Sequence, residues 1–232
     1  MLFAALLGSG RADSGLASAH RARALLGTDI WSQVIRIENG RPYRPYPPVV
    51  HALVFELEGA LWFYTASDGT QSLSHYVGRT AADKANLGPL LRDIDAGFAT
   101  WVPEAEGAAP AAVPLQLANG CFIESVALLR ARLAQGLTAE APRLLSYYVD
   151  TAAGRRGHTV LEFATAEGLR ILDPDRPTHP IRLRAGAAAD PRTLAFSLRS
   201  DIAQARWLPL TDFCRRAVLS AASRSHPRII VS

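Results

Sequence analysis

The first half of the chain carries the alternating hydrophobic and polar positions of β-strands. In residues 31–37 (Trp-Ser-Gln-Val-Ile-Arg-Ile), apolar and polar side chains alternate, which is typical of a half-buried strand. Residues 51–57 and 60–66 are rich in apolar side chains and flank Glu58-Gly59, so this stretch predicts a β-hairpin. The other elements expected in this half are a short helix over 17–26, a strand over 71–76, and a helix from an N-cap at Thr80 to about Asp95.

A proline- and alanine-rich segment at 103–114 interrupts these patterns. It is the clearest change of composition along the chain. It therefore suggests a boundary between an N-terminal α+β region over 1–110, either an extension or a subdomain, and a second unit over 111–232.

The second unit begins with a helical period and continues with strand patterns. An apolar stripe at helical spacing predicts a helix over 121–135. Strands are expected over 144–149, 158–163, 169–172, 181–184 and 193–196, with a turn at 154–157 and a last helix from Thr211 or Asp212 to about 222. Together these elements predict an α+β fold in which an antiparallel sheet packs against the 121–135 helix.

Composition narrows the classes of function. The net charge is +4, but of the 25 basic residues only Lys84 is a lysine, and the arginines are scattered. We interpret this bias as the codon usage of a GC-rich, bacterial-looking genome, and we expect no nucleic-acid partner. The two cysteines, Cys121 and Cys214, exclude a disulfide framework, and no metal-ligand spacing is present. We therefore expect no metal and no cofactor.

The N-terminus is the only stretch that resembles a targeting segment. Its apolar run ends at Gly8, which is too short to span a bilayer, and it lacks a basic start. We expect no membrane span, a loosely packed start, and mobile residues at 9–19. A cytoplasmic location is favoured, and export remains the alternative if the run is a trimmed signal.

Three chemistry-bearing residues fall at the ends of predicted elements. Cys121 begins a helix, whose free amides and dipole stabilise a thiolate and could stabilise an oxyanion. His158 opens a strand and could exchange a proton with the thiol. Asp173 ends the next strand, and a hairpin over 164–168 would bring it within a residue or two of the register of His158. A carboxylate there would orient the imidazole.

The segments around these residues resemble the transglutaminase-like branch of the papain-like cysteine enzymes. The matching segments are Asn119-Gly120-Cys121-Phe122, Gly157-His158-Thr159-Val160-Leu161-Glu162-Phe163 and Ile171-Leu172-Asp173-Pro174. In that family a Gly-Cys or Gly-x-Cys segment opens a helix, a His follows on a strand, often as Gly-His-x-x-x-Glu, and an Asp ends the next strand, commonly as Asp-Pro. The match covers roughly residues 115–177, about a quarter of the chain.

The resemblance implies a papain-like core and a catalytic triad of Cys121, His158 and Asp173. It implies acyl transfer from an amide through a thioester, with a peptide, a protein or another amide as substrate. Gln116 is the candidate oxyanion donor by analogy with the glutamine of papain-like sites; a solvent-facing linker glutamine is the alternative. The tryptophan that often precedes the aspartate in the family is absent from 168–172, and residues 1–110 match no pattern of the family.

Several functions remain open from the sequence. A peptidase or amidase would use water as the acyl acceptor, and a transglutaminase would use an amine. The same three residues also serve acyltransferases that act on small thioesters. The main alternative is a non-catalytic transglutaminase-like module for binding or assembly, with Cys121 covered by the first 110 residues. Taken singly, Cys121 could also be a buried apolar side chain, His158 a strand residue and Asp173 part of a turn.

Overall fold

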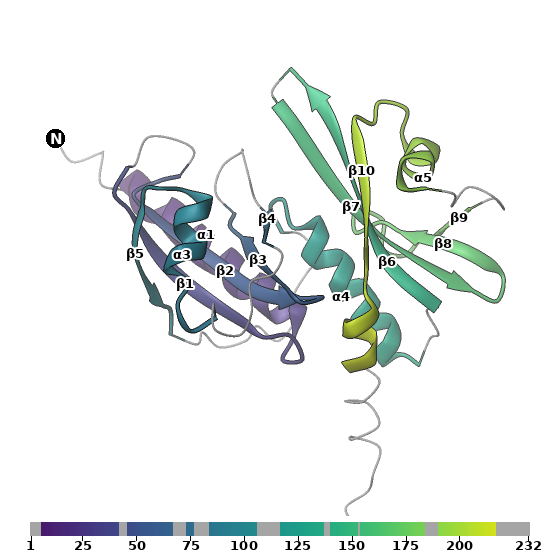
Figure 1. Cartoon of the computed structure of the whole chain (residues 1–232), viewed down its shortest axis with the longest axis horizontal. Helices are drawn as coiled ribbons and strands as arrows, with labels where there is room; N and C mark the ends of the chain where they lie inside the picture. The colour runs from purple at the N-terminus through teal and green to yellow at the C-terminus, as the bar shows by residue number, and fades with distance from the viewer. Residues whose placement is uncertain are drawn as a thin grey trace, which may run out of the picture. The chain divides into compact units, whose positions relative to one another are not determined.

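The computed structural model of the 232-residue chain describes residues 6–41, 46–66, 73–76, 84–105, 117–136, 140–152, 154–183 and 190–216. The chain divides into two compact units, Met1–Gly120 and Cys121–Ser232, and each contains a five-stranded antiparallel sheet (Figure 1). The α+β class predicted from the sequence is confirmed. Within the described residues, no helix has both the length and the apolar character needed to cross a bilayer.

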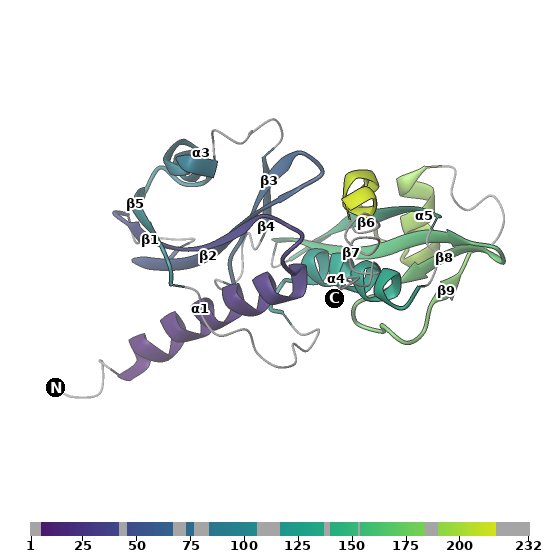
Figure 2. The same cartoon turned by 90° about the horizontal axis from the view of Figure 1, so that it is seen from below.

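The first unit is a sheet with one helix on each face. Its elements are α1 (Leu6–Leu26), β1 (Ser32–Asn39), β2 (Val49–Leu57), β3 (Ala60–Tyr64), β4 (Leu73–Tyr76), α3 (Gly88–Ile94) and β5 (Phe98–Pro103). The strand order is β4-β3-β2-β1-β5. Figure 2 shows α1 along one face of this sheet and α3 on the other. On the α3 side, Leu87, Leu90 and Leu91 share a buried core with side chains of the sheet.

The predicted hairpin between β2 and β3 is present. Glu58 and Gly59 both have positive φ angles, 51° and 72°, as the two central residues of a type I′ turn require. This turn sets the β2–β3 register, in which Leu57 pairs with Ala60.

Two expectations for the first unit need correction, and one strand was missed. Residues 9–19 are helical rather than mobile, because α1 runs from Leu6 and buries Ala19, Ala22 and Leu26. The helix expected from Thr80 to about Asp95 is not continuous: residues 84–85 and Gly88–Ile94 are helical and 86–87 are not, since Pro89 fits the first turn of a helix and not its interior; the proposed cap at Thr80 lies outside the described residues. Strand β5 was not predicted, because four of its six side chains are exposed and its apolar signal is weak.

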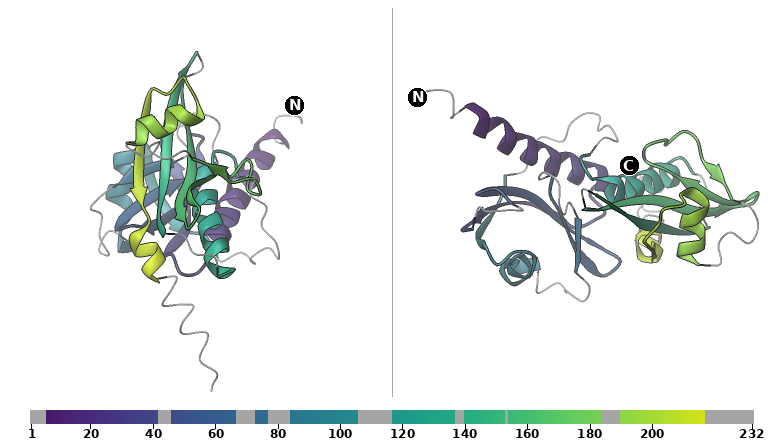
Figure 3. Two further views of the ribbon diagram at one scale, coloured as in Figure 1. Left: turned by 90° about the vertical axis from the view of Figure 1, so that its right-hand side faces the viewer. Right: turned by 90° about the horizontal axis from the view of Figure 1, so that it is seen from above.

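The second unit is also a sheet between helices. Its elements are α4 (Cys121–Ala134), β6 (Glu140–Thr151), β7 (Gly154–Thr165), β8 (Gly168–Leu172), β9 (Ile181–Arg182), α5 (Pro191–Leu198) and β10 (Gln204–Pro209), followed by a helical stretch over 211–216. The strand order is β10-β6-β7-β8-β9. The right-hand view of Figure 3 shows α4 on one face of this sheet and α5 on the other. The predicted helix over 121–135 is confirmed.

Two expectations for this unit were wrong, and one strand was missed. Residues 154–157 are not a turn but the start of β7, so the β6–β7 hairpin is longer than expected and His158 lies inside its strand. Residues 193–196 lie in α5 rather than in a strand, because the Asp190 side chain caps that helix by accepting from the Arg192 and Thr193 amides. Strand β10 was not predicted; it pairs with β6. The boundary expected near residue 110 lies outside the described residues.

Candidate active site

Cys121 is the first residue of α4, and a tight turn places it there. The N–H of Gly120 donates to the Leu117 carbonyl at 3.0 Å, and Asn119 adopts a positive φ of 55°. A Cβ atom on Gly120 would lie 2.1 Å from Leu117 Cβ, so only glycine fits. Gly120 therefore has a packing role in this turn. The half-buried Cys121 therefore starts the helix where the backbone amides have no helical partner.

A buried hydrogen bond fixes α4 against β7. The hydroxyl of Ser125, one turn after Cys121, donates to the Thr159 carbonyl at 3.1 Å. The Thr159 hydroxyl also lies 2.9 Å from that of Ser146 on β6, in a second buried hydrogen bond. Because Thr159 follows His158 directly, the first bond ties the start of α4 to the strand position that carries the imidazole.

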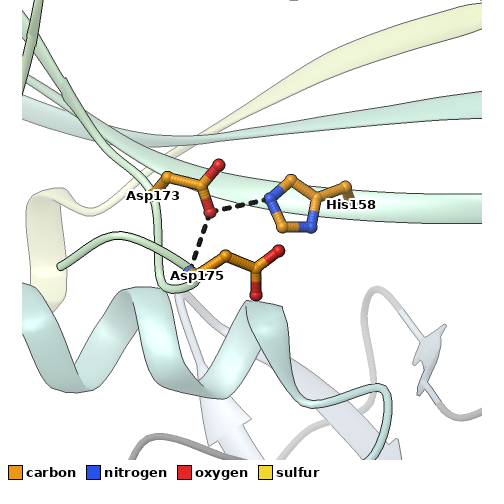
Figure 4. Close-up of side chains that lie close together, drawn as sticks. All are labelled: His158, Asp173 and Asp175. Atoms are coloured by element: carbon orange, nitrogen blue, oxygen red, sulfur yellow. Dashed lines mark hydrogen bonds and ion pairs between the residues drawn. The ribbon is translucent and has the colours of Figure 1, made fainter.

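The β7–β8 hairpin brings His158 and Asp173 together. Leu172 pairs with Leu161, and continuing this register puts Asp173 beside Val160, two residues from His158 and on the same side of the sheet. His158 Nε2 lies 2.9 Å from Asp173 Oδ1 (Figure 4). Both side chains are 23% exposed. The structure thus confirms the prediction that His158 and Asp173 lie close together.

The residues after β8 orient the Asp173 carboxylate. The N–H of Asp175 donates to Asp173 Oδ1 at 3.0 Å, so this oxygen accepts from both Asp175 and His158. The turn is closed by the Arg176 N–H, which donates to the Asp173 carbonyl at 2.9 Å. Burial opposes ionisation of Asp173, but the hydrogen bonds from His158 and from the Asp175 N–H hold the pKa of its carboxyl below the ordinary value.

His158 is held in its charged form. Burial works against the charge, but hydrogen bonds to Asp173 and to the Cys121 side chain outweigh it and raise the pKa of His158 to about 10. Since Asp173 occupies Nε2, the ring leaves Nδ1 for Cys121. At neutral pH the raised pKa therefore keeps His158 as an imidazolium between the Asp173 carboxylate and the Cys121 side chain.

An aromatic residue that was assigned only to a strand also belongs to this site. Tyr147 is the direct cross-strand partner of His158, and the two rings meet edge to face, with centroids 5.5 Å apart and planes at 63°. The only advance signal was its position on the strand before His158. That signal could not be used without the register of the hairpin.

His158, Asp173 and Asp175 also form a group that could hold a metal ion. Their ligand atoms all lie within 4.8 Å of one another. A metal would have to displace the proton of His158, and the raised pKa of that ring makes displacement unfavourable at neutral pH.

The other candidate residues lie elsewhere. Gln116 falls outside the described residues, so its role as an oxyanion donor stays a prediction. Cys214 forms no disulfide and is half-buried in the helical stretch over 211–216. It lies beside Phe213, which is buried, and the sequence assigned it no catalytic role.

The first unit contains a separate polar cavity of about 540 Å³. Arg23, Trp31, Lys84 and Glu104 are among its lining residues. The ammonium group of Lys84 forms an ion pair with Glu56 and lies 5.3 Å from the centroid of the Trp31 ring. The chain's one lysine is therefore held in place by two neighbours within this unit.

Comparisons with known proteins identify no relative of this chain. No family model matches the chain. No curated protein and no solved structure matches it either. The placement of Cys121, His158 and Asp173 is therefore the only basis for a function of this chain.

Proposed function

We propose that the chain is a transglutaminase-like cysteine enzyme that cleaves amide bonds through a thioester on Cys121. The observation that carries the proposal is the 2.9 Å hydrogen bond between Asp173 and His158, together with a thiol at a helix N-terminus that helps to raise the pKa of the same ring. Each group occupies the position that its chemical role requires: the thiol at the free amides, the imidazole beside it, and the carboxylate on the far ring nitrogen.

The arrangement of the second unit supports a papain-like core. One face of an antiparallel sheet packs against α4, the helix that presents the thiol, and two consecutive strands of that sheet supply the imidazole and the carboxylate. The order of elements along the chain, α4, β7 and β8, is the order that the resemblance implies.

In the first half-reaction, the Cys121 thiolate attacks the carbonyl carbon of the amide. The negative charge moves to the carbonyl oxygen, where amides at the start of α4 could stabilise it. As the carbon–nitrogen bond breaks, the His158 imidazolium gives its proton to the departing amine. The acyl group is then held on sulfur as a thioester, and His158 is neutral.

In the second half-reaction, neutral His158 takes a proton from the acceptor that attacks the thioester. With water the products are a carboxylic acid and the restored thiolate, and Asp173 stabilises the imidazolium that re-forms. We propose water as the acceptor, and hence a peptidase or amidase, because the small, bacterial-looking chain favours hydrolysis over crosslinking. The substrate is then a peptide, a protein or another amide, with no part for nucleic acid.

The first test compares the two thiols of the same molecule. Iodoacetamide at neutral pH should modify Cys121 at least tenfold faster than Cys214, because His158 favours the thiolate only at Cys121. Peptide mass mapping after timed quenching measures both rates in one sample, so Cys214 serves as the internal control. A His158→Ala variant should bring the two rates together.

The second test asks for turnover. Wild-type chain incubated with a mixture of short peptides should release new termini, and Cys121→Ala should not. Selective labelling without turnover on any peptide, protein or small amide would favour the alternative, a transglutaminase-like binding module. Equal, slow labelling of Cys121 and Cys214 would refute both the reactive thiol and the enzyme.

A further inference from the structure

Two consecutive tyrosines of β6 contact the two residues of β7 that matter most for the site. In the β6–β7 register, Tyr147 pairs with His158 and Tyr148 pairs with Gly157. Neighbouring residues of a strand point to opposite faces of the sheet. The Gly157-His158 segment therefore has one aromatic ring on each face.

Tyr148 covers the backbone of Gly157. A Cβ atom on Gly157 would lie 2.9 Å from Tyr148 Cε1 and 3.1 Å from Cδ1, so the ring rests where a side chain would otherwise be. The Arg206 guanidinium on β10 donates to the Tyr148 hydroxyl at 3.1 Å and holds the ring from the next strand. A side chain at 157 would have to displace this ring, so the contact between Tyr148 and Gly157 supports the backbone that leads into His158.

Tyr147 supports the imidazole on the other face. It is only 8% exposed and belongs to the core that α5 covers, together with Val149, Val160 and Ile171. Its ring meets the His158 ring edge to face at 5.5 Å. Pairs of rings in this geometry attract each other beyond the effect of burial, and a packed ring has few alternative positions.

The electrostatic surroundings keep Tyr147 neutral. Burial is the main cause that raises the pKa of Tyr147 to about 12, and the charges of Asp173, Cys121 and Asp175 act in the same direction, against a smaller opposing effect of Arg199. A neutral phenol keeps the same contact with His158 across the range in which the imidazole and the thiol exchange protons.

We propose that Tyr147 is a positioning residue, whose ring holds the His158 imidazole in the orientation that joins Asp173 to Cys121. Tyr148 completes this clamp by fixing the Gly157 backbone. The inference rests on the proposed function, since it assigns Tyr147 a part in activating the thiol. Tyr147 acts through its ring and not through its hydroxyl, so a variant that keeps the ring and one that removes it should behave differently.

The test separates ring from hydroxyl with Tyr147→Phe and Tyr147→Leu. The first keeps the edge-to-face contact, and the second removes it while leaving an apolar side chain. The measurements are the rate of Cys121 alkylation by iodoacetamide from pH 5 to 9 and the titration of the His158 ring protons by NMR. Tyr147→Phe should match wild type within about twofold. Tyr147→Leu should slow alkylation at neutral pH by about threefold to tenfold, as expected from the strength of an aromatic pair.

The titration provides a readout that a merely structural role would not move. In folded Tyr147→Leu, the pKa of His158 should fall from about 10 toward the ordinary 6.5, because a ring free to rotate spends less time between its two partners. If Tyr147→Leu fails to fold, Tyr147→Met fills the same space with a flexible side chain and gives the same comparison.

Each outcome is decisive. Wild-type behaviour of the folded Leu or Met variant would overturn the proposal, and so would a Phe variant as slow as the Leu variant, which would assign the effect to the hydroxyl. Failure of the proposed function looks different: the wild type would then show no turnover, with or without excess reactivity of Cys121. The His158 titration would still report whether Tyr147 orients the ring.

Discussion

Replacing Asp173 with asparagine tests the link between the carboxylate and the thiol. The pKa of His158 is raised from 6.5 to about 10, which corresponds to about 5 kcal/mol at about 1.4 kcal/mol per tenfold change, and Asp173 shares this effect with Cys121. A hydrogen bond to a charged group contributes about 1.5–3 kcal/mol. Asp173→Asn should therefore shift the equilibrium from the thiolate–imidazolium pair toward the neutral pair by about tenfold to a hundredfold.

The assay is the pH dependence of Cys121 alkylation, with Cys214 as the internal reference. Between pH 6 and 7 the rate for Asp173→Asn should fall by up to the same factor. Above about pH 9 the loss should disappear, because ordinary thiols ionise there without help from a neighbour. NMR titration of the His158 ring should show its pKa moving toward 6.5 in the variant.

Asp175→Asn is the matched control. It removes a neighbouring exposed carboxylate but keeps the backbone N–H that donates to Asp173. Alkylation of Cys121 in this variant should stay within about twofold of wild type. Equal losses in the two variants would show that general negative charge, and not the hydrogen bond at 2.9 Å, controls the imidazole, and the reasoning would be refuted.

Three further predictions concern stability. His158 contributes fully to the free energy of unfolding below about pH 6.5, and this contribution is lost as the pH rises through about 10. Asp173 contributes above about pH 3.8, and its contribution is lost on acidification. The melting temperature should therefore be highest between about pH 3.8 and 6.5, and a His158→Gln variant that keeps the alkaline decline would contradict this. Gly120→Ala should lower the free energy of unfolding in urea by about 1–3 kcal/mol, because the new methyl overlaps a neighbouring leucine; an unchanged midpoint would contradict the packing role. Arg143→Ala should cost about 3 kcal/mol or more, since it leaves the buried Glu162 carboxylate without its partner at 2.5 Å; adding Glu162→Gln should restore part of the loss, and no recovery would argue against the pair.

The sequence was sufficient where local patterns decided the structure. The helix at Cys121 follows from its apolar period, and the approach of Asp173 to His158 follows from a short hairpin whose strands must pair. Both arrangements involve residues near in sequence, so few alternatives compete with them.

The sequence was insufficient where distant residues or a single cap decided the outcome. Residues 193–196 resemble a strand until Asp190 is recognised as a helix cap. The strand β10 pairs with β6 across a long separation, and its own apolar pattern is weak. The contact between Tyr148 and Gly157 depends on the β6–β7 register, which starts from the pair Thr151 and Gly154, whereas the turn expected at 154–157 implied a different register.

The single lysine has a practical consequence for any acyl-transfer chemistry of this chain. Lys84 is the only side-chain amine, and it is engaged by Glu56 and stacked against Trp31. An isopeptide bond between copies of the chain through a side-chain amine could therefore form at one position only, and a ladder of crosslinked products would be traceable to a single peptide. The same property limits amine-reactive dyes to one side chain, Lys84, besides the α-amino group of the chain, so few labelled products are expected.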